Sequence, residues 1–256
     1  MEAHVAELWS TQEGPPDGPV MLLLHGAGVG AWMWRDQVAV LRERYRVIAP
    51  DLPGHDHSAG VPFTSSAELV EDLARLVRAH ARGREVAVVG FSYGAQLALA
   101  LATSHPDLVR HVVAVSALTA AMPLEAASRA LVRAAAPLGR QRWFARLQAR
   151  SMFVPDDLVD DYLRTVRALP TRDLVAVLAA NAAFRAPQTW SAYPGRALLL
   201  AGDREVKPLV RGLRALQEQL PGAELEIVPG AGHGLPLERP TWFTTRLLAF
   251  LDPTTR

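Results

Sequence analysis

The hydrophobic positions of the chain fall into two alternating kinds of segment. Short runs of leucine, valine, isoleucine and alanine, bounded by glycine and proline, are typical of strands buried on both faces. Six such runs lie at residues 20–24, 46–49, 85–89, 111–115, 196–201 and 224–228. Segments with the period of a helix lie at residues 32–44, 66–82, 93–104, 206–220 and 238–251. This order predicts an α/β fold whose mostly parallel sheet is covered by helices on both faces.

One interval interrupts this alternation. From about Leu118 to about Trp190 the chain has no strand-like run, and prolines divide its amphipathic segments into short helices. We therefore expect a helical cap, residues 118–190, inserted into a core domain of residues 1–117 and 191–256. Large apolar side chains in the cap either pack it onto the core or line a substrate pocket. The pocket candidates are Trp143, Phe144, Met152, Phe153 and, after the last strand, Leu235.

The strongest chemical signal is the sequence Gly90-Phe91-Ser92-Tyr93-Gly94. It has the pattern G-x-S-x-G and lies between a strand-like run and a helical segment. A serine at such a tight turn projects its hydroxyl, and the backbone N–H groups that begin the helix face any negative charge that develops nearby. The pattern predicts a nucleophilic serine at position 92.

A serine nucleophile needs a base, normally a histidine oriented by a carboxylate. His233 lies in a glycine-rich loop between the last strand-like run and the last helical segment, where it can reach a neighbouring strand end. Asp203 and Glu205 both follow the preceding strand-like run, so spacing alone leaves two candidates for the carboxylate. The order serine, acid, histidine along the chain is the order of α/β-hydrolases.

Composition excludes several classes of function. The 256 residues carry 27 basic and 26 acidic side chains, a formal net charge of +1, so we expect neither nucleic acid nor membrane as a partner. There is no cysteine, which excludes disulfides and cysteine-ligated metals. The first twenty residues contain no apolar core of a secretory signal, and the longest low-charge stretch is too short to span a membrane. We expect a cytoplasmic protein with a small-molecule substrate, and either a monomer or a homodimer.

Four motifs together resemble the α/β-hydrolase-fold superfamily. The sequence from His25 to Gly28 is similar to its oxyanion loop, and that from Asp51 to Ser58 to its D-x-P-G-H-G-x-S turn; the other two are the motifs around Ser92 and His233. The resemblance implies an α/β-hydrolase fold with a cap, and a serine hydrolase with a catalytic triad, an oxyanion hole and no cofactor. It aligns Glu205 with the family's acid and leaves Asp203 as the alternative. It also implies that the backbone N–H groups of Ala27 and Tyr93 form the oxyanion hole.

The chain departs from the family pattern at two positions. Glu205 stands where aspartate is usual, and Asp56 stands where glycine is usual, a change that we expect to alter only a turn. His25, His55 and His57 are expected to be structural. The implied activity is hydrolysis of a small to medium, largely apolar carboxylic ester through an acyl-enzyme. Alternatives are a C–C bond hydrolase, a lactonase, an amidase or peptidase, and a non-hydrolytic lyase, cyclase or ligand-binding receptor.

Two other functions could be assigned to residues in the first two turns. Residues 26–31 fit the pattern G-x-G-x-x-A after a strand, and Asp51 follows the next strand, as in a dinucleotide-binding turn. Trp32 and Trp34 crowd this turn, however, and a dehydrogenase would not need the triad.

A zinc site could be formed by Asp51, His55, Asp56 and His57. No further ligands lie at a suitable spacing, so no metal is expected.

Overall fold

The computed structural model describes residues 8–122 and 126–252, and within them seven strands form a single sheet. The strands are β1 (Ser10–Glu13), β2 (Val20–Leu24), β3 (Arg46–Pro50), β4 (Val86–Phe91), β5 (Val109–Val115), β6 (Arg196–Gly202) and β7 (Glu224–Val228). Their order is β1-β3-β2-β4-β5-β6-β7. Only β1 among these pairs antiparallel to its neighbour. The predicted α/β fold with a mostly parallel sheet is confirmed.

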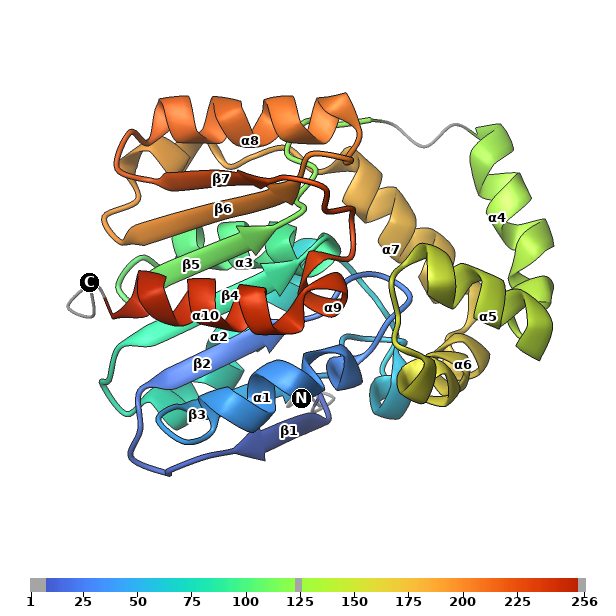
Figure 1. Ribbon diagram of the computed structural model, residues 1–256, viewed down its shortest axis with the longest axis horizontal. Helices are drawn as coiled ribbons and strands as arrows, with labels where there is room; N and C mark the ends of the chain where they lie inside the picture. The colour runs from blue at the N-terminus through green and yellow to red at the C-terminus, as the bar shows by residue number, and fades with distance from the viewer. Residues whose placement is uncertain (1–7, 123–125, 253–256) are drawn as a thin grey trace, which may run out of the picture.

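The sheet has a hydrophobic core on each of its faces. Along β2, Val20, Leu22 and Leu24 belong to one core and Met21 and Leu23 to the other, because successive side chains of a strand point to opposite faces. The first core includes helices α2 (Ser66–Ala81), α3 (Tyr93–Ser104) and α8 (Lys207–Gln219). The second includes α1 (Arg35–Leu41), α9 (Leu235–Glu238) and α10 (Pro240–Leu251). Figure 1 shows α1 and α10 in front of the sheet and α2 and α3 behind it.

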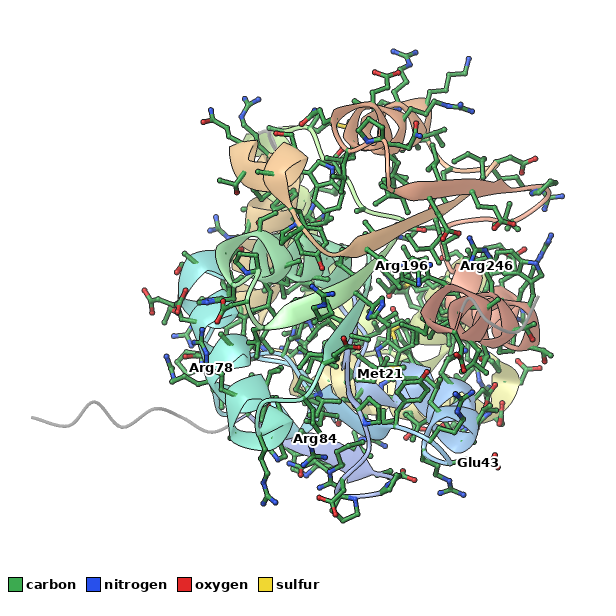
Figure 2. All side chains as sticks on the ribbon, turned by 90° about the vertical axis from the view of Figure 1, so that its left-hand side faces the viewer. Met21, Glu43, Arg78, Arg84, Arg196 and Arg246 are labelled. Carbon is green, nitrogen blue, oxygen red and sulfur yellow. The ribbon has the colours of Figure 1, made fainter. Side chains whose placement is uncertain are left out.

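Charged side chains connect α10 to the sheet near the amino ends of the parallel strands, the end that faces the viewer in Figure 2. Arg246 of α10 donates to Glu224 and Glu226 of β7, at 2.6 and 2.7 Å. Arg196, at the start of β6, donates to Glu224 as well, at 3.3 Å, and lies over the ring of Phe250. These contacts lie at the amino ends of β6 and β7. Ligands of open α/β sheets bind at the carboxyl ends of the strands, which is the opposite end of this sheet.

Four helices lie between β5 and β6 in the described part of the chain. They are α4 (Ala126–Gly139), α5 (Arg142–Ser151), α6 (Val159–Ala168) and α7 (Thr171–Ala183). Figure 1 shows them beyond the carboxyl ends of the parallel strands, where residues 118–190 were expected to form a cap. Residues 123–125 of that range lie outside the described residues. We call the α4 to α7 segment the cap, and its boundaries stay a prediction.

The cap is attached to the core through α6. Two core 3-10 turns, η1 (Ala31–Trp34) and η2 (Asp56–Ser58), face this helix. Trp32 Nε1 donates to Thr165 Oγ1 at 2.9 Å, and Thr165 is fully buried. Arg164 donates from Nε and one terminal nitrogen to the two carboxylate oxygens of Asp56, each at 2.8 Å. The expectation that Asp56 alters only a turn is wrong, because its carboxylate reaches across to the cap.

Candidate active site

Ser92 is the residue between β4 and α3, and its backbone is strained. Its φ of 54° lies in the left-handed region, which is costly for a residue with a Cβ. The glycines on either side permit this turn. A Cβ on Gly90 would lie 2.1 Å from the carbonyl oxygen of Gly94, and one on Gly94 would lie 2.2 Å from that of Leu24. The local sequence thus forms the sharp strand-to-helix turn that presents Ser92 at the carboxyl edge of the sheet.

The structure brings Ser92, His233 and Glu205 into one chain of contacts. Ser92 Oγ lies 3.1 Å from His233 Nε2, and His233 Nδ1 lies 3.0 Å from Glu205 Oε2. The Glu205 side chain is only 3% exposed, while the imidazole is 44% exposed. With its proton on Nδ1, directed at the carboxylate, the imidazole can accept the serine proton at Nε2. The arrangement can therefore generate a serine nucleophile.

Asp203 occupies a different position from Glu205. Its Oδ1 accepts a hydrogen bond of 2.8 Å from the backbone N–H of Gly230, which has a positive φ of 68°. Asp203 therefore closes the turn after β7, whereas Glu205 contacts the histidine. Spacing did not separate the two carboxylates because both follow β6 within three residues.

The loop that carries His233 is held by contacts that sequence reasoning missed. Ser116, directly after β5, is buried and donates from Oγ to the backbone carbonyl of His233 at 3.1 Å. On the other side, the N–H of Gly232 donates to Glu238 Oε2 at 2.7 Å. The ring of Phe91 lies 5.2 Å from the imidazole ring, centre to centre. An unusual φ of 57° at Ser116 is a property of the folded backbone, and no sequence pattern marked it.

Two backbone N–H groups are candidates for the oxyanion hole. Gly26 lies directly against the nucleophile, since a Cβ added there would be 3.3 Å from the Cβ of Ser92. Ala27 follows it in the same loop, and Tyr93 is the first residue of α3. The first N–H groups of a helix have no partner within the helix. The Ala27 and Tyr93 N–H groups therefore stay the predicted oxyanion donors.

Buried histidines brace this oxyanion loop. His25 Nδ1 lies 2.7 Å from the Gly26 carbonyl oxygen, and its Nε2 accepts from the N–H of Leu52 at 2.8 Å. His55 Nε2 accepts from the N–H of Gly28 at 3.0 Å. Burial lowers the pKa of His25 to about 4 and that of His55 to about 3, so both are neutral at pH 7. Their contacts give both histidines a structural role.

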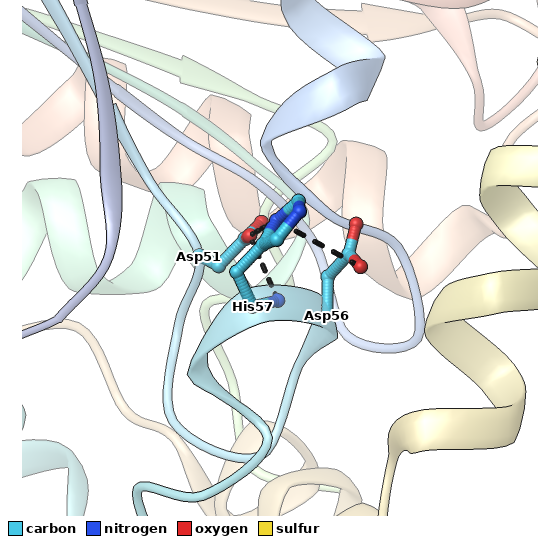
Figure 3. Close-up of side chains that lie close together, drawn as sticks. All are labelled: Asp51, Asp56 and His57. Carbon is cyan, nitrogen blue, oxygen red and sulfur yellow. Dashed lines mark hydrogen bonds and ion pairs between the residues drawn. The ribbon is translucent and has the colours of Figure 1, made fainter.

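Asp51, Asp56 and His57 gather in the cluster shown in Figure 3, where their potential ligand atoms lie within 4.8 Å of one another. These atoms already have partners in the protein. Asp51 accepts from the N–H of Ala31 at 2.7 Å and from His57 Nδ1 at 2.9 Å, and Asp56 accepts from Arg164. Because Asp51 closes this loop, its carboxylate is also not free for the ribose of a dinucleotide. The donor set fits a structural network better than a metal site.

A cavity of about 250 Å³ lies between the oxyanion loop and the cap. Ala27 and Gly28 line it from the core, and the remaining lining comes from the cap. It is mostly apolar, with Arg140, Gln148, Tyr162 and Thr171 as the side chains that carry polar groups. The helix α4 contributes small side chains, Ala135 and Ala136, together with Gly139. The space between the oxyanion loop and the cap therefore has the chemistry of a site for a short apolar chain.

The five residues predicted to line a pocket lie in different places. Met152 lines the cavity, and Phe153 packs against Gly232 of the histidine loop. Leu235 is fully buried in the core. Trp143 is 65% exposed on α5 and contacts Phe144 edge-to-face. Trp143 and Phe144 do not line the cavity, because the buried face of α5 is formed by Ala145 and Ala149.

The family model described as "Alpha/beta hydrolase family" matches residues 21–246. The chain belongs to the alpha/beta hydrolase family. Among curated relatives, the "Magnesium-chelatase 30 kDa subunit" of Rhodobacter capsulatus is 41% identical over 111 residues, which are 43% of this chain and 38% of that subunit. An uncharacterized protein of Mycobacterium tuberculosis is 28% identical over 267 residues, covering 93% of this chain and 76% of the relative.

Solved structures with this fold include esterases and a lactonase. A structure reported with carboxylesterases of Nitrososphaera gargenis has a TM-score of 0.81 at 20% identity and covers 96% of this chain and 94% of that one. The enol-lactonase of Burkholderia xenovorans has a TM-score of 0.80 at 21% identity, covering 95% and 96% of the two chains. At such identities the likeness shows the fold, and the predicted α/β-hydrolase fold is confirmed.

Proposed function

We propose that the protein is a serine hydrolase that cleaves carboxylic esters with a small to medium apolar acyl group. The observation that carries the proposal is the uninterrupted contact from Ser92 Oγ through the His233 imidazole to the buried Glu205 carboxylate. The curated relatives named above match over part of their length or are uncharacterized, and the geometry of the site is what supports the activity.

In the proposed reaction, His233 Nε2 takes the proton of Ser92 as Oγ attacks the ester carbonyl. Glu205 stabilises the imidazolium, and the N–H groups of Ala27 and Tyr93 donate to the oxyanion. The imidazolium then protonates the leaving alcohol, and water activated by the same imidazole releases the acid. General base catalysis and the oxyanion donors would each lower the barrier by about 2 to 4 kcal/mol.

Two measurements on the same variants test the proposal: covalent labelling of the active-site serine and the rate of ester hydrolysis. We expect a fluorophosphonate to label the wild-type protein and to leave Ser92→Ala unlabelled, while Ser151→Ala, which removes an exposed serine of the cap, labels normally. Hydrolysis of p-nitrophenyl butyrate by Ser92→Ala or His233→Ala should fall by ~1,000-fold or more. Near-native turnover by either variant would overturn the assignment.

The cavity supports the choice of acyl group. At about 30 Å³ for each group the size of a water molecule, 250 Å³ has room for a chain of roughly six to eight carbons. Ala136→Phe should therefore shift the preference in a series of p-nitrophenyl esters toward shorter chains. The matched control is Ala134→Phe, since Ala134 is exposed on the same helix. Equal chain-length profiles for the two variants would place the acyl group elsewhere.

A panel of substrate classes identifies the type of bond that the protein cleaves. Lactones, aryl amides and vinylogous diketones should be assayed beside the esters, with wild type and with Ser92→Ala. Preference for one of these classes, with complete dependence on Ser92, would retain the nucleophile and change the substrate. Turnover that is independent of Ser92 would reject the proposed nucleophile, and absence of turnover on the whole panel would favour a non-hydrolytic member of the fold.

A further inference from the structure

The balanced charge of the whole chain hides a local asymmetry in the cap. Residues 126–155, which include α4 and α5, contain six arginines and no aspartate or glutamate. The rest of the chain has 21 basic and 26 acidic residues. A surface this uneven attracts anions locally even though the net charge is only +1. The expectation that no membrane is involved considered the net charge and the length of the apolar stretches, and neither of these reports local asymmetry.

The same two helices expose large apolar side chains. On α5, Trp143 and Leu147 are four residues apart and 65% and 59% exposed; on α4, Leu131 and Leu138 are 70% and 46% exposed. Residues four or seven apart share one side of a helix. Each helix of this pair therefore presents an apolar stripe without a partner, next to arginines.

Neighbouring groups neutralise only part of this charge. Arg142 pairs with Asp160 at 3.0 Å, and Asp156 and Asp160 share a surface hollow with Arg142, Arg146 and Arg150. Among the described residues, no ion pair joins Arg146 or Arg150 to an acid. The basic character of the segment therefore exceeds what the two aspartates offset.

The inner sides of the same two helices border the cavity. Gly139 and Arg140, at the turn between α4 and α5, line it, as does Gln148 of α5. Figure 1 shows both helices at the end of the molecule farthest from the amino ends of the parallel strands. None of the described helices is long and apolar enough to cross a membrane. Contact with a bilayer would therefore be made at its surface.

We propose that the α4–α5 face, formed by Leu131, Leu138, Trp143, Leu147, Arg146 and Arg150, docks on an anionic lipid surface. Apolar side chains enter the boundary between headgroups and acyl chains, tryptophan favours that boundary, and arginines bind lipid phosphates. An apolar substrate dissolved in the bilayer then reaches the cavity without crossing water. A second copy of the chain is a poorer occupant for a symmetric contact, because it would place Arg146 and Arg150 opposite the same two arginines.

Vesicle flotation tests this docking, with Ser92→Ala measured beside the wild type so that lipid turnover plays no part. We expect binding to phosphatidylcholine vesicles containing about 30% phosphatidylglycerol at low salt, and loss of binding at about 0.5 M salt. Arg146→Gln/Arg150→Gln and Leu131→Ser/Leu147→Ser should each weaken binding about tenfold. Arg211→Gln/Arg214→Gln, which removes two exposed arginines from α8, should not.

Three outcomes would overturn the docking proposal. They are absence of wild-type binding, equal binding by the α4–α5 variants, and a dimer in light scattering that those variants dissociate. Turnover of soluble p-nitrophenyl butyrate should stay unchanged in the two double-arginine variants and in the double-leucine variant. None of the substituted residues lines the cavity or contacts the triad. Failure to bind vesicles with esterase activity intact would reject docking and leave the proposed hydrolysis standing.

Discussion

Asp56 and Arg164 are joined by two hydrogen bonds of 2.8 Å across the boundary between the core and the cap. The Asp56 side chain is 3% exposed, and its backbone has a φ of 40°, a conformation that glycine adopts without strain. Pairing with this carboxylate raises the pKa of Arg164. The chain thus holds a strained aspartate at a position where the family pattern has glycine, and the carboxylate fastens α6 to η2.

Removing this pair should loosen the cap. Arg164→Gln leaves a buried carboxylate without its cation, so we expect a loss of about 1 to 3 kcal/mol in the free energy of unfolding, given that the guanidinium is partly exposed. A double-mutant cycle measures the coupling energy of the pair. It compares the free energy of unfolding in urea for wild type, Arg164→Gln, Asp56→Asn and the double variant. Faster hydrogen exchange of the α6 amides should accompany both single variants.

The matched control for this pair is Arg35→Gln. Arg35 and Asp157 also bridge the core and the cap, at 2.6 Å, but both side chains are about half exposed. Exposed ion pairs contribute little, so a change below about 1 kcal/mol is expected. A coupling energy for Asp56 and Arg164 no larger than that for Arg35 and Asp157 would contradict the anchoring role.

The inner strands of the sheet were predictable from sequence because burial on both faces requires continuous apolar residues, and the edge strand β7 was predictable because Leu225, Ile227 and Val228 keep it partly apolar. The other edge strand, β1, was not predictable. It reads Ser-Thr-Gln-Glu. It lies at the edge of the sheet and pairs antiparallel with β3, so polar residues are tolerated there.

Motif residues of the site were predictable for a similar physical reason. Ser92 and His233 lie in turns whose glycines are required by close backbone contacts, and such glycines leave a pattern in the sequence. The side chains of the cap leave no such pattern. Trp143 and Met152 look equally suited to a pocket by composition, but helix rotation on α5 exposes Trp143 and places Met152 beside the cavity.

The choice between Glu205 and Asp203 should be visible in turnover. Glu205→Gln keeps the shape of the side chain but removes the charge that faces His233 Nδ1, so kcat should fall by ~100- to 10,000-fold. The Asp203 carboxylate accepts a hydrogen bond from the N–H of Gly230 and does not contact His233. Asp203→Asn should therefore retain kcat within about threefold. Steady-state hydrolysis of p-nitrophenyl butyrate measures both. The reverse ranking would assign the role to Asp203.

Ser116 is expected to position His233 without touching substrate. Ser116→Ala removes the donor to the His233 carbonyl, so we expect kcat to fall about three- to tenfold, by roughly the 1 kcal/mol of a lost hydrogen bond, with KM unchanged. Ser116→Gly removes the same donor but relieves the positive φ, so it should lose as much kcat while unfolding at a higher urea concentration than Ser116→Ala. Different kcat values for the two variants would show that backbone strain, rather than the hydrogen bond, matters.

The two buried histidines beneath the oxyanion loop should make the protein sensitive to acid. In the unfolded chain their pKa is near 6.5, whereas in the folded protein burial lowers the pKa of His25 to about 4 and that of His55 to about 3. Between these values the unfolded state binds more protons, so stability is fully present above pH 6.5 and is lost as the pH falls toward 4. For His25 alone the loss is about 3 kcal/mol over this window.

Urea unfolding between pH 7.5 and about 4.5 measures this loss as a falling free energy of unfolding. His55→Gln removes one of the two titrating groups while retaining an amide that can bond near Gly28, so its stability should be lower at pH 7.5 but should decline less steeply with acid. His80→Gln is the control, because His80 lies on α2 and is only partly buried. If the slope of stability against pH were the same in wild type and His55→Gln, the acid sensitivity would belong to groups other than His55.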